Sequence, residues 1–353
     1  MVMVISRWDR QQRQLRLQRR SSLLSLKLFT LSLSRRKFLR CLLIFLAIIA
    51  ILPPLYFHFS LRRFNQMQLR KCSWMQSPPL VCAHGGDSMK AFPNTMNAYN
   101  IALSSKVDCI EIDVSRSSDG VLFALHDRSR DLQRICGNTT SKVGYLSMKE
   151  IIDLRSSHQH SLELDVTIPT IEDALVLVSG SVRQVILDAK VGPPLYEKGL
   201  AKDILSVVER TKCRNCIVWA KSDSLARDLI QLSTDAMLMF MTAMKVGYIV
   251  MIDPLTGSRM KLLRMRGAGV VGVYHPLIDE QLVKILHSEF VVIGGDNRRN
   301  KKVYAWTVDK EDSMQKMLLE RVDAVVTSNP SLLQRVMQDV RTQCFQQGFS
   351  LNS

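Results

Sequence analysis

Nine short runs rich in β-branched and aromatic residues alternate with longer amphipathic stretches from residue 79 onward. This alternation is typical of a parallel sheet whose crossovers are helices. Only the six residues SRSSDG, with an Asp-Gly turn, join the second and third runs, which is too short for a helical crossover. The third run is therefore expected to pair antiparallel, as the return arm of a hairpin. The runs are 80–84, 109–114, 121–126, 184–190, 216–220, 247–252, 270–274, 302–308 and 323–327.

Without the hairpin arm, eight parallel strands remain in about 270 residues, which predicts an α/β fold of the (β/α)₈ barrel type. The 353 residues are 46% hydrophobic and 23% charged, which is enough apolar surface for such a core. This composition excludes a disordered chain and a small disulfide scaffold.

One uncharged apolar segment precedes the expected barrel. Residues 41–61 contain no Lys, Arg, Asp or Glu over 21 positions. A helix of this length, rising about 1.5 Å per residue, extends roughly 31 Å, the thickness of a bilayer core. The Pro53-Pro54 pair inside the segment is tolerated in membrane helices. We therefore predict one transmembrane helix at 41–61.

The positive charge of the chain is concentrated around this segment. Of the net charge of +16, residues 72–353 contribute only +2, whereas residues 1–71 hold 15 Lys and Arg against the single acid Asp9. Eleven of these cations precede the span and four follow it, so the positive-inside rule places the barrel on the lumenal or extracellular side. Orientation alone explains the basic tail, and we expect no nucleic-acid partner. The alternative is a chloroplast or mitochondrial transit peptide in the first 40 residues.

Two features agree with the secretory orientation. Asn138 begins a glycosylation sequon, and seven cysteines follow the span, where disulfides form in an oxidising compartment. Cys213 and Cys216 have the spacing of half a metal site, but no second pair or His partners complete it. The predicted parts are a basic cytosolic tail (1–40), a signal-anchor helix (41–61), a juxtamembrane linker (62–78), the barrel domain (79–340) and a C-terminal tail (341–353).

Polar residues gather near the carboxyl ends of the expected strands, which form the active-site face of a barrel. Glu111 and Asp113 are two residues apart on an otherwise apolar strand, so both point to the same side. Asp188 and Lys190 repeat this arrangement on the next ring strand. Carboxylates among apolar strands need a compensating cation, and oxygen ligands suit a hard divalent ion, Ca²⁺ or Mg²⁺. Zn²⁺ would require Cys or several His.

Two histidines flank this acidic group. His84 ends the first strand and His126 ends the hairpin, which makes them candidates for one general base and one general acid. Lys190 adds a fixed positive charge for an anionic group of the substrate. The combination of a cation, a lysine and two histidines indicates attack at phosphorus.

A series of short motifs carries a family resemblance. They are Ala83-His84-Gly85-Gly86, Asn94-Thr95 with Ala98-Tyr99, Glu111-Ile112-Asp113-Val114, Leu125-His126-Asp127, Asp188-Ala189-Lys190, Ala305-Trp306-Thr307-Val308 and Val322-Asp323-Ala324-Val325-Val326-Thr327-Ser328-Asn329-Pro330. In this order and spacing the chain resembles the glycerophosphodiester phosphodiesterases over residues 79–340. Residues 188–194 and 273–276 look like the plant membrane-anchored branch of that family. The resemblance implies a phosphoinositide-phospholipase-C-like (β/α)₈ barrel.

The resemblance also implies an activity: metal-dependent hydrolysis of glycerophosphodiesters to sn-glycerol 3-phosphate and an alcohol, through a cyclic phosphate. Asp188 stands where the family usually has a metal-binding Glu. The implied roles are the acid/base pair His84 and His126, the metal ligands Glu111, Asp113 and Asp188, the phosphate-binding Lys190, and Trp306 as a wall of the substrate site.

Two positions depart from the family pattern. Gly85 replaces an Arg that would hold phosphate, and Pro93 replaces an acidic residue near the metal. His275, at the end of its own strand, is a candidate to compensate for the missing Arg. The alternative functions are a lysophospholipase D-type enzyme on the same site and a catalytically impaired barrel acting as a binding module. We infer no obligate protein partner.

Overall fold

The computed structural model describes residues 35–126, 132–133, 142–158, 168–240, 244–288 and 300–350. The chain divides into two compact units, Met1–Gln66 and Met67–Ser353. The sequon residue Asn138 and Asp127, which follows the hairpin histidine, lie outside the described residues.

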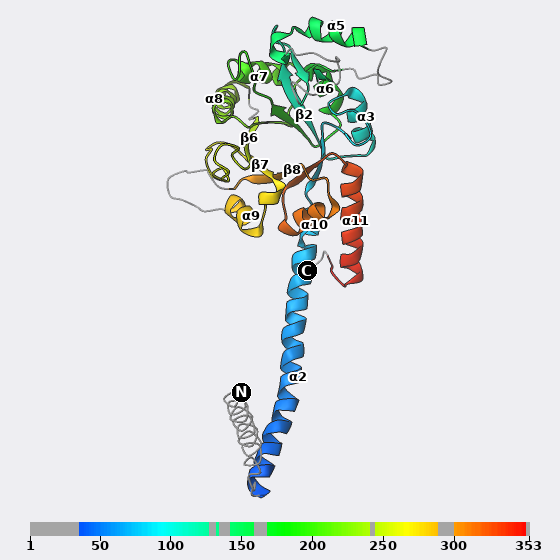
Figure 1. The fold of residues 1–353 in the computed structure, drawn as a ribbon, viewed down its shortest axis with the longest axis vertical. Helices are drawn as coiled ribbons and strands as arrows, with labels where there is room; N and C mark the ends of the chain where they lie inside the picture. The colour runs from blue at the N-terminus through cyan, green and yellow to red at the C-terminus, as the bar shows by residue number, and fades with distance from the viewer. Residues whose placement is uncertain are drawn as a thin grey trace, which may run out of the picture. The chain divides into compact units, whose positions relative to one another are not determined.

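The first unit contains most of a long helix, α2 (Arg35–Cys72), drawn in blue in Figure 1. Pro53 and Pro54 lie inside this helix. The stretch Lys37–Gln76, which continues into the short 3₁₀ helix η1 (Ser73–Gln76), includes a window of mean hydropathy 2.5, none of it buried. The structure therefore contains a helix long and apolar enough to cross a bilayer where the sequence predicts one.

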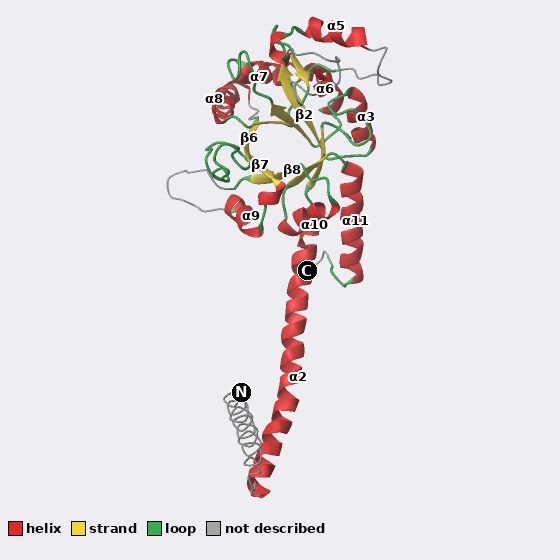
Figure 2. Ribbon diagram, in the orientation of Figure 1, coloured by secondary structure: helices red, strands yellow, loops and turns green. Residues whose placement is uncertain are grey.

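The second unit contains a closed ring of eight parallel strands, as predicted (Figure 2). The ring closes because β1 (Leu80–His84) pairs with both β2 (Cys109–Arg116) and β9 (Ala324–Thr327). The other ring strands follow in chain order: β4 (Gln184–Ala189), β5 (Cys216–Ala220), β6 (Lys245–Val250), β7 (Val270–Tyr274) and β8 (Lys302–Trp306).

The one described strand outside the ring is the predicted hairpin arm. β3 (Leu122–Ala124) pairs antiparallel with the end of β2, with Val114 opposite Ala124. The turn is closed by the Ser117 backbone N–H, which donates to the Val121 carbonyl at 3.0 Å. Gly120 supplies the positive φ of 84° that this turn requires. The hairpin brings His126 to the carboxyl end of the ring.

Helices surround the ring (Figures 1 and 2). Six of the described helices follow a residue whose side chain accepts a hydrogen bond from the backbone N–H three residues later, the usual N-cap arrangement: Thr95, Ser147, Thr170, Ser222, Asp279 and Asn329. The helices are α3 (Met96–Ser104), α5 (Met148–His158), α6 (Ile171–Val178), α7 (Leu200–Arg210), α8 (Asp223–Phe240), α9 (Glu280–His287), α10 (Glu311–Glu320) and α11 (Pro330–Gln346).

Alternate residues of each strand belong to two different cores. On β2, Ile110 and Ile112 belong to the large core shared with the surrounding helices. Cys109 instead packs with Ile217 and Trp219 in a smaller core inside the ring. Side chains alternate along a strand, so residues two and four positions after Cys109 also face the interior. The fold therefore directs Glu111 and Asp113 into the mouth of the barrel.

A disulfide joins the end of α2 to α11. Cys72 and Cys344 have Cα atoms 5.9 Å apart and are separated by 272 positions in the sequence. Two polar contacts accompany this bond: Lys71 Nζ donates to Gln343 at 2.9 Å, and Arg70 lies 3.0 Å from a carboxylate oxygen of Glu280. The last turn of α2, which belongs to the second unit, is thus fastened covalently to α11 and by charge to Glu280 of α9.

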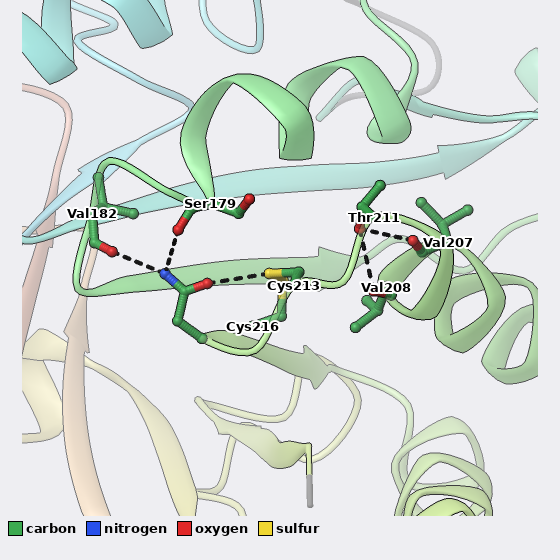
Figure 3. The surroundings of a disulfide bond; sticks show 8 residues. Ser179, Val182, Val207, Val208, Thr211, Cys213 and Cys216 are labelled. Carbon is green, nitrogen blue, oxygen red and sulfur yellow. Dashed lines mark hydrogen bonds between the residues drawn. A yellow bond between two sulfur atoms is a disulfide. The ribbon is translucent and has the colours of Figure 1, made fainter. Parts of the chain in front are cut away.

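A second disulfide joins Cys213, in the connection between α7 and β5, to Cys216, the first residue of β5 (Figure 3). In the same connection, the Asn215 side-chain amide donates to the carbonyls of Ser179 and Val182, each at 2.9 Å. The two cysteines that have the spacing of half a metal site are therefore bonded to each other.

Candidate active site

Three buried carboxylates meet at the carboxyl ends of β2 and β4. Glu111, Asp113 and Asp188 are 2%, 0% and 6% exposed, and one ligand oxygen from each lies within 4.8 Å of the others. Strand register explains the meeting, because Asp113 and Asp188 are direct partners in the parallel pairing of β2 with β4. The structure thus brings together the three residues that the sequence pattern singles out.

A network from β1 and the loop after it orients two of these carboxylates. The Gly85 backbone N–H donates to Glu111 Oε2 at 3.0 Å. Asn94 donates through Nδ2 to Asp113 Oδ2 at 2.6 Å and accepts from the Asp113 backbone N–H at 3.1 Å. Tyr99, fully buried on α3, donates its hydroxyl to Asn94 Oδ1 at 3.2 Å. The sequence motifs contain Asn94 and Tyr99 but do not indicate a role for either residue.

Lys190 lies against the acidic group. Its Nζ is 2.6 Å from Asp113 Oδ1 and also contacts Asp188 Oδ2. Burial opposes the charge of Lys190, but the surrounding carboxylates outweigh it and raise the pKa of this lysine. Burial likewise opposes ionisation of Asp113, yet Lys190 and the two site histidines hold the pKa of that carboxyl below its usual range. Both groups are therefore charged at neutral pH.

When all three carboxylates are ionised, the single charge of Lys190 balances only one of them. Burial raises the pKa of Glu111 well above its usual range, and the charges of Asp113 and Asp188 raise it further. Asp188 Oδ1 is buried and has no hydrogen-bond partner among the described residues. A group of three carboxylates and one lysine suits a divalent cation, which would balance the remaining negative charge and bind the unpaired Asp188 oxygen. The donor set is all oxygen, as Ca²⁺ and Mg²⁺ prefer.

Two histidine rings lie at the same end of the ring of strands. His84, the last residue of β1, and His126, beyond β3, have ring centroids 5.8 Å apart with planes inclined by 66°. Burial lowers the pKa of His84 from its ordinary value of 6.5, so this ring is uncharged at neutral pH. His126 is exposed. One site therefore contains a partly buried neutral imidazole and an exposed one.

Aromatic residues line the other side of the mouth. Trp306 ends β8, and its ring centroid is 5.7 Å from that of Tyr274, which ends β7. His275 begins the 3₁₀ turn η4 (His275–Leu277) and packs against Tyr274, with ring centroids 5.7 Å apart and planes inclined by 59°. That His275 compensates for the missing Arg stays a prediction.

Lys221, directly after β5, places its Nζ 5.6 Å from the Trp306 ring centroid.

A barrel with carboxylates, a lysine and two histidines at the carboxyl ends of its strands has the features of a phosphodiesterase. Comparison with known proteins agrees. A model of the glycerophosphoryl diester phosphodiesterase family matches residues 84–332. The chain belongs to this family and is an enzyme, a glycerophosphodiester phosphodiesterase.

Individual relatives support the assignment. Glycerophosphodiester phosphodiesterase GDPD4 of Arabidopsis thaliana is 60% identical over 319 residues, covering 90% of this chain and 91% of the relative. A glycerophosphodiester phosphodiesterase of Caldanaerobacter subterraneus is 25% identical over 258 residues, covering 72% and 96%.

Solved structures share the fold. The glycerophosphoryl diester phosphodiesterase described for Silicibacter pomeroyi superposes with a TM-score of 0.60 at 18% identity, covering 75% of this chain and 95% of that one. An Oleispira antarctica phosphodiesterase, solved in complex with the product sn-glycerol-3-phosphate, gives a TM-score of 0.55 at 20% identity, covering 74% and 97%.

Proposed function

We propose that this enzyme hydrolyses glycerophosphodiesters to sn-glycerol 3-phosphate and an alcohol with the help of one divalent cation, Ca²⁺ or Mg²⁺. The observation that carries the proposal is the meeting of three buried carboxylates, within 4.8 Å of one another, beside a lysine and two histidines. When bound, the cation would supply positive charge to the phosphate oxygens. Glu111, Asp113 and Asp188 are the residues that would hold it.

The remaining groups have distinct tasks in this proposal. His84, whose pKa is lowered by burial, accepts the proton of the glycerol hydroxyl next to the phosphate, and that oxygen attacks phosphorus. His126 donates a proton to the departing alcohol. Water then opens the cyclic phosphate with the two roles reversed. Lys190 stabilises the negative charge of the phosphate, and Trp306 forms a wall of the substrate site.

We further propose that α2 anchors the enzyme in a membrane through residues 41–61, with the barrel domain (79–340) lumenal or extracellular. The long apolar helix and the distribution of cations around it support this arrangement. The disulfides Cys72–Cys344 and Cys213–Cys216 add independent support, because such bonds persist in oxidising compartments. Glycosylation at Asn138 belongs to the same proposal.

The deciding experiment uses the full chain in detergent with glycerophosphocholine or lysophosphatidylcholine as the substrate. Release of choline and sn-glycerol 3-phosphate from glycerophosphocholine, lost on chelation and restored by Ca²⁺ or Mg²⁺, is the expected result. A clear preference for lysophosphatidylcholine would instead favour the lysophospholipase D-type alternative. Full activity after exhaustive chelation would contradict the metal dependence.

A further inference from the structure

Lys221 reaches across the mouth of the barrel. It follows the last residue of β5, while Trp306 ends β8, and two ring strands, β6 and β7, lie between these strands. Its Nζ nevertheless lies 5.6 Å from the centroid of the Trp306 ring. The side chain is therefore directed over the opening rather than toward the surrounding helices.

The interior below this contact is built to hold aromatic rings. Trp219, two residues before Lys221, is buried inside the ring. A Cβ atom at Gly272 would lie 2.9 Å from the Trp219 ring and 3.4 Å from Trp306 Cδ1, and one at Gly247 would lie 3.1 Å from Trp219 Cβ. The two glycines of β6 and β7 thus make room for both indoles. This packing supports Trp306 as a fixed aromatic surface beneath the Lys221 amine.

Strand register relates Lys221 to the phosphate-side lysine. Ala189 of β4 is paired with Ala220 of β5, and Lys190 and Lys221 come directly after these partners. Both lysines therefore leave neighbouring strands on the interior side. Their surroundings differ, because Lys190 is ion-paired to two aspartates, whereas Lys221 is exposed and forms no ion pair with a described residue. The mouth thus carries one neutralised and one unneutralised ammonium group.

The positive charge of Lys221 can act on the alcohol group of the substrate, the part in which glycerophosphodiesters differ. All glycerophosphodiesters share the glycerol and the phosphate, and they differ in the alcohol. An open indole face attracts quaternary ammonium groups such as that of choline. Here the Lys221 amine occupies this face and repels a second cation. A hydroxyl-rich uncharged alcohol can instead hydrogen-bond to the amine, and an anionic one gains attraction.

From this juxtaposition we infer that Lys221 is a specificity-determining residue, which selects glycerophosphodiesters of uncharged polyol or anionic alcohols over those of cationic alcohols. The inference rests on the proposed function of the site and deepens it by naming the substrate class. Lys221 takes no part in the proton transfers, so its removal should change the preference among substrates more than the ability to cleave one.

The test compares kcat/KM of the full chain for glycerophosphoinositol and glycerophosphocholine. The informative variant is Lys221→Met, which keeps the length of the side chain and removes its charge, and Lys221→Arg keeps the charge. Lys245→Met is the matched control, because Lys245 is also exposed but begins β6 at the opposite end of the barrel. We expect the wild type to prefer the inositol diester, with Lys221→Met shifting the ratio about tenfold toward choline. Lys221→Arg and Lys245→Met should keep the wild-type ratio.

Ionic strength gives a second readout. Because Lys221 is exposed, salt should screen its charge and weaken the wild-type preference, while the Lys221→Met ratio should stay constant. Hydrolysis of both substrates with a ratio unchanged by Lys221→Met would overturn this inference and leave the proposed function intact. Hydrolysis of neither substrate by the wild type would overturn the proposed function and the inference with it.

Discussion

The imidazole rings of His84 and His126 lie edge to face, with centroids 5.8 Å apart. They reach this position from different elements, the first ring strand and the hairpin arm. A displacement at phosphorus needs one proton taken from the attacking oxygen and one given to the leaving oxygen. Two rings at this spacing at one end of the barrel are suited to that pair of transfers.

We predict that His84→Ala and His126→Ala each lower kcat by about 10² to 10⁴, the usual contribution of one general acid or base. The two groups act in one step, so the double variant should lose far less than the product of the single losses. Release of sn-glycerol 3-phosphate measures the rate, and thermal unfolding checks that the variants fold. A wild-type kcat in either folded single variant would contradict the assignment.

The pH dependence should reflect the buried histidine. Burial lowers the pKa of His84 from 6.5, so the base is lost only when the pH falls below that value. We expect kcat/KM to be independent of pH near neutrality, where His84 is already deprotonated, and to fall about tenfold per pH unit on the acid side. A pH–rate profile measured in buffers of constant ionic strength checks this. An acid limb centred above pH 6.5 would show that another group limits the rate.

Metal removal should affect stability as well as rate. If the three carboxylates share a cation, its addition at one hundred times its Kd should raise the free energy of unfolding by about 2.7 kcal/mol. Glu111→Gln removes a ligand charge at nearly constant shape and should lose this stabilisation. Glu209→Gln, an exposed change on α7, should keep it. Thermal unfolding with and without Ca²⁺ or Mg²⁺ makes the comparison, and equal shifts in both variants would place the ion elsewhere.

Gly85 is restricted by its backbone and its neighbours. Its φ is +62°, and an added Cβ would lie 3.1 Å from Pro93 Cβ and 3.3 Å from Asn94 Nδ2, the atom that donates to Asp113. We therefore expect that Gly85→Arg does not recover the phosphate contact of the family's Arg. Gly85→Ala should lower the free energy of unfolding by about 1 to 2 kcal/mol and also lower kcat/KM.

A matched glycine separates these two effects. Gly120 has a φ of +84°, and nothing lies within 4 Å of its Cβ position. Gly120→Ala should thus carry the backbone penalty alone and leave kcat/KM unchanged. Chemical denaturation and steady-state kinetics on the same preparations provide the comparison. A Gly85→Arg enzyme with an improved KM would show that the loop adapts to the larger side chain.

The proposed topology predicts that the barrel is protected from protease added outside sealed microsomes. Asn138→Gln should then remove a glycan and increase mobility on a gel. Permeabilising the vesicles with detergent is the control, since it should expose the barrel to digestion. Digestion in intact vesicles would overturn the signal-anchor interpretation, and import into chloroplasts with loss of the first 40 residues would favour the transit peptide.

The fold could be predicted because its signals are local. The alternation of strands and helices indicated the ring, and the six residues SRSSDG indicated the antiparallel arm. Strand ends were less accurate: the expected 247–252 is observed as Lys245–Val250, and 302–308 as Lys302–Trp306. Val308 lies beyond β8, but its backbone N–H donates to the Val326 carbonyl and its side chain is buried in the large core, so its apolar character reflects packing after the strand has ended.

The acidic group could also be predicted, since Glu111 and Asp113 share a strand face whatever the rest of the fold does. The hydrogen bonds that orient these carboxylates could not be predicted from the sequence. Asn94 reaches Asp113 only because the loop after β1 folds back over the ring, and neither residue's sequence neighbours indicate this. The meeting of Lys221 with Trp306 depends on the closure of the whole ring.

The bond between Cys72 and Cys344 encloses nearly the entire barrel in one covalent loop, since 272 positions separate the two residues. A protease cut in any connection within that loop would break the chain without releasing a fragment. The nicked enzyme would keep both pieces joined to α2 until the disulfide is reduced and the pieces unfold. If α2 anchors the enzyme as proposed, shedding of the barrel into solution therefore requires cleavage on the N-terminal side of Cys72.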